Sequence, residues 1–135
     1  MKRYIPFLIS ALLATSCIGA NKLQEEFIEE TVTESLVIEG KTVFSFDRNN
    51  CQESYSPDKM EYRVGDDTMS NYYVLHADRP IGGDGSTLKG DLVWTTDVDV
   101  RQKTGMEFKV VKSRGELYWL WCRKARTGLV VRVVK

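Results

Sequence analysis

Two aspartates offer the clearest opportunity for acid–base chemistry in this sequence. Asp97 and Asp99 stand two positions apart, and paired carboxylates of this kind can serve as acid and base or bind Ca²⁺. They also occupy the polar positions of a segment that alternates apolar and polar residues. A solvated strand face therefore competes with the catalytic interpretation.

Other residue types add little catalytic chemistry. His76, the single histidine, has no neighbouring cluster of the ligands that metal sites use, so we expect a structural role for it. The glycine-rich segment at residues 82–86 lacks the lysine of a phosphate-binding loop, and no serine lies in a Gly-x-Ser-x-Gly motif. The sequence thus predicts no catalytic residue, no metal ligand and no cofactor.

The first seventeen residues have the pattern of an export signal. Lys2 and Arg3 precede an apolar run over residues 5–13, which is too short to span a bilayer as a helix. The segment that follows is Leu13-Ala14-Thr15-Ser16-Cys17. It resembles the lipobox of bacterial lipoproteins, in the looser form found in Bacteroidetes. The resemblance covers residues 1–17 and implies that residues 1–16 are removed and that Cys17 receives a diacylglycerol.

Lipidation of Cys17 would also set the location of the protein. Two or more acyl chains anchor a protein stably to a membrane, whereas one does not. Under the sorting rule of this family, Ile18 in place of aspartate after the cysteine implies the outer membrane. We therefore expect a lipid-anchored protein of the bacterial cell envelope, facing either the periplasm or the surface. An ordinary signal peptide cut after Ala20 is the alternative, and it would discard Cys17.

Export also bears on the two remaining cysteines. Cys51 and Cys122 would reach an oxidising compartment, where paired cysteines are usually bridged. We predict a disulfide between them, which would stabilise the domain by about 4 kcal/mol in the chain-entropy model. Two separate buried thiols are the alternative.

The chain divides into three parts by composition. Residues 1–16 are the signal peptide, residues 17–33 are the lipidated cysteine with a glutamate-rich flexible tether, and residues 34–135 are the folded domain. In the domain the apolar period becomes two, with turn signals such as Glu39-Gly40 and a polar loop over residues 47–59. The clearest strand is predicted over residues 91–101. Seven or eight short strands favour an all-β fold, a small antiparallel β-barrel or β-sandwich.

An aromatic strand over residues 116–123 carries the candidate ligand-binding residues. Trp119, Trp121 and Arg123 share one face of this strand, and Cys122 lies on the other. If Cys122 points into the core, the two indole rings form an exposed ridge that suits a sugar ring or a partner loop. If the rings fill the core instead, which is more common for large aromatic side chains, no ridge exists.

The charge balance argues against nucleic acid as a partner. The chain has 19 basic and 19 acidic residues, and removal of residues 1–16 leaves 17 and 19, a net charge of −2 without any basic block. We predict a non-enzymatic domain that binds an envelope protein or a glycan, or that acts as an accessory. An envelope hydrolase and a structural subunit of an outer-membrane assembly are the alternatives.

Overall fold

The computed structural model describes residues 21–68 and 70–133. Residues 21–30 are helical, and no helix in the described part of the chain is long and apolar enough to cross a membrane. A short 3-10 helix, η1 (Arg48–Asn50), precedes the third strand. The strands are β1 (Ser35–Ile38), β2 (Lys41–Ser45), β3 (Cys51–Ser56), β4 (Glu61–Asp66), β5 (Tyr72–Ala77), β6 (Thr87–Thr96), β7 (Asp99–Arg114), β8 (Leu117–Cys122) and β9 (Thr127–Arg132).

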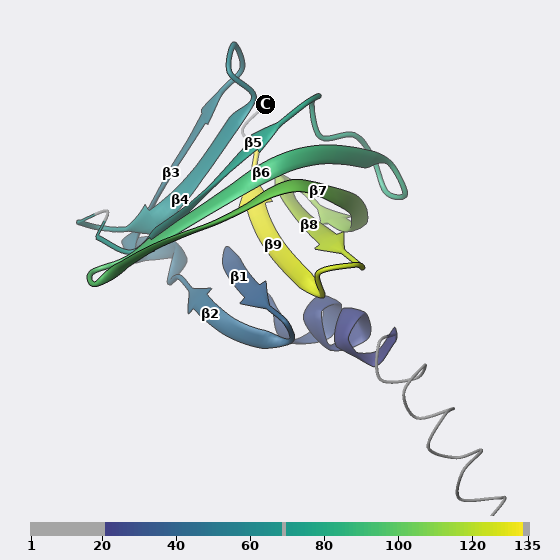
Figure 1. The fold of residues 1–135 in the computed structure, drawn as a ribbon, viewed down its shortest axis with the longest axis horizontal. Coiled ribbons are helices and arrows are strands. Elements are labelled where there is room, and N and C mark those ends of the chain that lie inside the picture. Colours follow the sequence, from purple (N-terminus) through teal and green to yellow (C-terminus); the bar gives the residue numbers. More distant parts are fainter. Residues whose placement is uncertain (1–20, 69, 134–135) are drawn as a thin grey trace, which may run out of the picture.

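All nine strands form one antiparallel sheet in the order β2-β1-β9-β8-β7-β6-β5-β4-β3. The sheet curls into a half-barrel, with β2 and β3 as its two edges (Figure 1). This confirms the predicted all-β antiparallel class, with nine strands where seven or eight were expected. The first hairpin also follows its turn signal. Glu39 (φ 51°) and Gly40 (φ 81°) both have the positive φ that a tight two-residue hairpin turn requires.

Two segments differ from the prediction. Residues 47–59 were expected to form a loop, but they contain η1 and β3. Residues 91–101 were expected to form one strand, but β6 ends at Thr96, the chain turns at Asp97 and Val98, and β7 begins at Asp99. The alternation of apolar and polar residues continues through this turn, so periodicity alone does not reveal the reversal.

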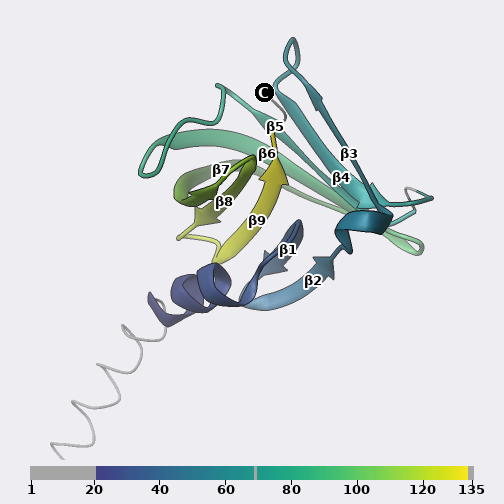
Figure 2. The ribbon, with the colours of Figure 1, turned by 180° about the vertical axis from the view of Figure 1, so that it is seen from behind.

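The sheet packs apolar side chains on both faces. The larger cluster fills the concave side of the half-barrel and includes Tyr73, Phe108, Leu120 and Cys122. The second cluster lies on the other face of β8 and β9, where residues 21–30 cover the sheet (Figure 2). Residues 21–30 are therefore a packed helix and not the flexible tether that the composition suggested.

The contact between the helix and the sheet depends on close approach. Phe27 is 3% exposed, and its ring centroid lies 5.3 Å from that of Trp121. Gly128 in β9 makes room for this pair, because a Cβ atom there would lie 2.7 Å from the Phe27 ring and 2.8 Å from the Trp121 ring. The helix can therefore pack this closely on β9 because residue 128 has no side chain.

Candidate functional site

The two tryptophans of the candidate ridge belong to the core. Trp119 is 1% exposed and Trp121 is 3% exposed. Cys122 does point into the concave core, so the rings lie on the outer face, but the helix covers them. Trp119 Nε1 donates hydrogen bonds to Thr31 Oγ1 at 2.8 Å and to the Thr31 carbonyl at 3.1 Å. The ridge is therefore absent, and Arg123 is the one exposed member of the three candidates.

The predicted disulfide is wrong, because both cysteines are free thiols. Cys122 ends β8 inside the apolar core, whereas Cys51 begins β3 beside carboxylates. Strands β7, β6, β5 and β4 lie between β8 and β3 in the sheet. The fold thus holds the two thiols apart, and the alternative of two separate thiols describes the molecule.

The other candidates do not assemble into a catalytic centre. Cys17 lies outside the described residues. Asp97 is exposed in the β6–β7 turn, and Asp99 forms an ion pair at 2.8 Å with the neighbouring Arg101. His76 is half exposed and contacts Glu61 at 3.0 Å.

An open groove of about 1160 Å³ lies between β7 and the β8–β9 turn. Two acidic side chains, Glu39 and Glu107, line it. Five basic side chains also line it: Lys89, Lys103, Lys109, Arg123 and Lys124. Within the described residues none of these five forms an ion pair, so the groove has a surplus of uncompensated positive charge.

The groove exists because β7 extends beyond the end of β8. Residues 109–114 of β7 pair with β8, but residues 99–108 pair only with β6. Within the part of β7 that β8 does not cover, a bulge interrupts the pairing with β6. Gly105 lies in this bulge, has a φ of 62°, and its N–H donates to Asp91 Oδ1 at 2.9 Å. One backbone edge of β7 is therefore without a strand partner in the described structure, and it faces the basic groove.

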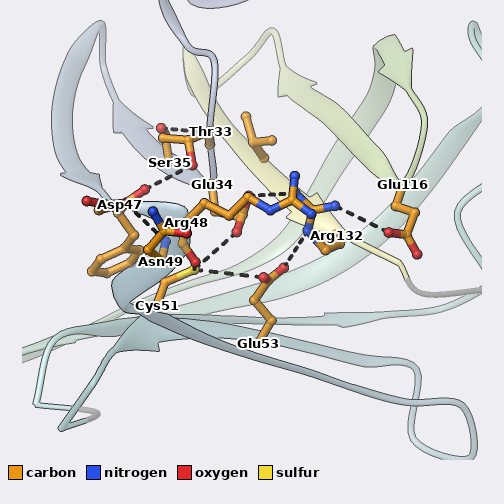
Figure 3. Close-up of polar contacts among 12 residues, drawn as sticks. Thr33, Glu34, Ser35, Asp47, Arg48, Asn49, Cys51, Glu53, Glu116 and Arg132 are labelled. Atoms are coloured by element: carbon orange, nitrogen blue, oxygen red, sulfur yellow. Dashed lines mark hydrogen bonds and ion pairs between the residues drawn. The ribbon is translucent and has the colours of Figure 1, made fainter.

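A buried polar cluster lies at the β3 edge of the sheet, where Arg132 of β9 reaches toward β3 (Figure 3). Its guanidinium contacts Glu53 Oε2 at 3.1 Å, Glu116 Oε1 at 3.3 Å and Glu34 Oε1 at 3.6 Å. The Cys51 thiol donates to Glu34 Oε2 at 3.2 Å, and Glu53 Oε1 lies 3.8 Å from Cys51 Sγ. The cluster thus connects both ends of the curled sheet.

Local structure fixes each member of this polar cluster. Glu34 directly precedes β1, and its carbonyl accepts a hydrogen bond from the N–H of Phe46, just after β2. Asp47 caps η1 by accepting from the N–H of Asn49, and η1 delivers the chain to Cys51. Cys51 and Glu53 are two positions apart in β3 and therefore share one face of the strand.

Burial and like charges determine the electrostatics of the cluster. The pKa of Cys51 is raised to about 12 by burial, by its hydrogen bond to Glu34 and by the charges of Glu34 and Glu53. The pKa of Glu53 is raised by burial and by the Glu34 charge, which outweigh the opposing effect of Arg132. Cys51 is thus a protonated thiol at neutral pH, which makes it a poor nucleophile.

Few features of the sequence indicate this polar cluster. Glu34, Glu53, Glu116 and Arg132 are far apart along the chain, and each belongs to a residue type that is usually exposed. Arg132 interrupts the apolar run of the sequence over residues 129–134, and this interruption is the one local signal. No family model, curated protein or solved structure matches this chain.

Proposed function

We propose that this protein is a lipid-anchored component of the bacterial cell envelope whose β-domain is a non-enzymatic binding module. Its occupant would be an acidic, extended segment of a partner protein, bound in the groove between β7 and the β8–β9 turn. One observation carries this proposal: the unpaired edge of β7 faces a groove with five basic and two acidic side chains.

The unpaired β7 edge and the excess of basic side chains together indicate the chemistry of the ligand. An unpaired strand edge offers N–H and C=O groups to an added strand, which is a common mode of peptide recognition. Uncompensated lysine and arginine side chains favour a ligand with negative charge and speed its association. An acidic peptide in extended conformation satisfies both requirements, whereas an acidic glycan satisfies only the second.

A peptide-binding measurement tests this function. We expect a short peptide that alternates glutamate with valine to bind and to change the fluorescence of Trp121, which lines the groove. Lys103→Glu combined with Arg123→Glu should weaken binding about tenfold or more, because two charge-assisted contacts are lost. Lys59→Glu, in the β3–β4 turn, is the matched control and should leave affinity unchanged.

A backbone-modified ligand separates strand addition from charge attraction alone. The same peptide with N-methyl groups at alternate residues cannot donate to the β7 edge and should not bind. Equal binding of the methylated peptide, or binding of a polyuronate oligosaccharide in place of the peptide, would overturn strand addition.

The lipid anchor is tested separately on Cys17. Metabolic labelling with a fatty acid should mark the protein, and Cys17→Ser should abolish both the label and the retention in the membrane fraction. A wild-type protein that is unlabelled and soluble would refute this part of the proposal.

A further inference from the structure

We propose that Glu34, Cys51 and Glu53 form a binding site for a thiophilic divalent cation, Zn²⁺ in the first instance. This site is separate from the basic groove and does not depend on the proposed peptide ligand. It is built from β3 and from the residue that precedes β1, and Figure 3 shows the three side chains converging.

The three ligand atoms already have the spacing of a zinc site. With a Zn–S distance of about 2.3 Å and a Zn–O distance of about 2.1 Å, tetrahedral geometry places sulfur and oxygen about 3.6 Å apart. Cys51 Sγ lies 3.2 Å from Glu34 Oε2 and 3.8 Å from Glu53 Oε1. All three atoms lie within 4.8 Å of one another, so movements of about 1 Å or less in the two carboxylates would complete the geometry.

Arg132 divides the carboxylate oxygens into two sets. It contacts Glu34 Oε1 and Glu53 Oε2, while the other oxygen of each carboxylate faces Cys51 Sγ. Outer contacts of this kind commonly orient the ligands of a metal site. Arg132 would therefore hold both carboxylates for metal binding without occupying the position between them.

The fully buried Glu34 is incompletely compensated. Its side chain is 0% exposed, Oε1 accepts no hydrogen bond, and the guanidinium nitrogen at 3.6 Å is too far for one. Three carboxylates, from Glu34, Glu53 and Glu116, surround the single positive charge of Arg132. Sharing this guanidinium leaves the buried Glu34 carboxylate incompletely compensated, which is costly, and a bound cation would reduce this cost.

The mixture of sulfur and oxygen ligands selects the class of metal. A cysteine sulfur favours Zn²⁺ over Mg²⁺ and Ca²⁺, which prefer oxygen ligands throughout. Three protein ligands leave the fourth tetrahedral position to water. On binding, the Cys51 proton would leave to solvent as the Zn–S bond forms, so no oxidant or reductant is needed.

Cobalt titration tests the site, because Co²⁺ occupies zinc sites and its bond to a thiolate gives a charge-transfer absorption. The full chain carrying Cys17→Ser retains two thiols, Cys51 and Cys122. We expect one equivalent of Co²⁺ to produce the charge-transfer band, and Zn²⁺ to displace it. Cys51→Ser should remove the band, whereas Cys122→Ala, which removes the thiol in the apolar core, should retain it.

A second variant covers the case in which Cys51→Ser does not fold. Glu53 is partly exposed, and Glu53→Gln keeps the size of the side chain while removing one anionic ligand. We expect its affinity for Co²⁺ to fall about tenfold or more with the circular dichroism of the sheet unchanged. Absence of the thiolate band in the parent chain, its persistence in Cys51→Ser, or unchanged affinity in Glu53→Gln would overturn the assignment.

Discussion

Two buried regions join distant parts of this chain, and they do so with opposite chemistry. On the outer face, the helix over residues 21–30 covers Trp119 and Trp121 with apolar contacts. On the concave side, Arg132 connects β9 to Glu34 and Glu53 through charged contacts. Both regions unite segments far apart in sequence, but only the first uses residue types that are usually buried.

The two regions should therefore respond differently to the loss of a side chain. Loss of an apolar side chain costs roughly the transfer free energy and the cavity it leaves, so the penalty follows its size. Loss of one partner in a buried ion cluster leaves the remaining charge uncompensated. The loss of stability is therefore set by the charge that remains and not by the size of the side chain removed. Substitutions in the two regions can therefore test whether the cluster is held by its charges.

The largest effect is expected from Arg132→Met, which keeps an apolar stem but removes the charge. We expect a loss of about 3–5 kcal/mol in the free energy of unfolding, because the buried Glu34 carboxylate would lose the cation that lies beside it. Urea denaturation at neutral pH with a chelator present measures this loss. Arg114→Met, at an exposed position in β7, is the control and should stay within about 0.5 kcal/mol of wild type.

A double-mutant cycle decides whether the charge is responsible. In the Glu34→Gln background, Arg132→Met should cost much less than it does alone, since the buried negative charge is gone. Equal costs in both backgrounds would show that compensation of the Glu34 charge is not what Arg132 contributes, and this basis for the contrast between the two regions would be lost.

Phe27→Ala tests the apolar region and should have the next largest effect. We expect a loss of about 3 kcal/mol, because the ring is buried against Trp121 and its removal leaves a cavity between helix and sheet. Urea denaturation gives the free energy, and increased quenching of tryptophan fluorescence by acrylamide would show that the helix no longer covers the rings. Val32→Ala, at a side chain 78% exposed, should change neither measurement.

Gly128→Ala tests the same apolar contact by adding one methyl group. The new Cβ would lie within 3 Å of both Phe27 and Trp121, so the helix must shift outward. We expect a loss of about 1–2 kcal/mol, which is typical of overpacking. In the Phe27→Ala background the added methyl has space, and the loss should shrink or vanish; an unchanged loss would mean that Gly128 is required for another reason.

The same contrast explains what the sequence predicted and what it missed. Alternating apolar residues predicted most strands, and Glu39-Gly40 predicted the first turn, because these signals act between near neighbours. β3 (Cys51–Ser56) was missed because its sequence is mostly polar and lacks the alternating apolar residues that indicate a strand. It is nevertheless a strand, because it pairs with β4. The segment 21–30 was predicted to be a tether because the contacts that hold it as a packed helix are with Trp119 and Trp121, about ninety residues later in the chain.

The two cysteines show why a site needs more than residue type. Export and an even count suggested a bridge, but pairing depends on where the strands place the thiols. Cys51 and Cys122 lie on strands separated by four others. The same topology places Cys51 beside Glu34 and Glu53, and no spacing rule in the sequence connects those three residues.

The smallest effect is expected at Glu61, which forms ion pairs with two exposed side chains, Arg63 and His76. Burial raises the pKa of Glu61, but hydrogen bonds from Arg63 and His76 outweigh it, and the net shift is downward. A lowered pKa means that the folded state favours the charged carboxylate. The stabilisation is therefore complete above the ordinary glutamate pKa and is lost as pH falls through the lowered pKa of the folded state.

Glu61→Gln should therefore cost less than about 1 kcal/mol at pH 7, since its partners are 39% and 48% exposed and water screens the pairs. Urea denaturation between pH 7 and pH 3 should show the difference from wild type shrinking as the medium becomes acidic. Glu107→Gln, at an exposed position of β7, is the control and should stay within about 0.5 kcal/mol of wild type at pH 7. A cost at Glu61 as large as that at Arg132 would contradict this comparison. It would mean that ion pairs with exposed partners are as sensitive to the loss of a charge as the buried cluster is.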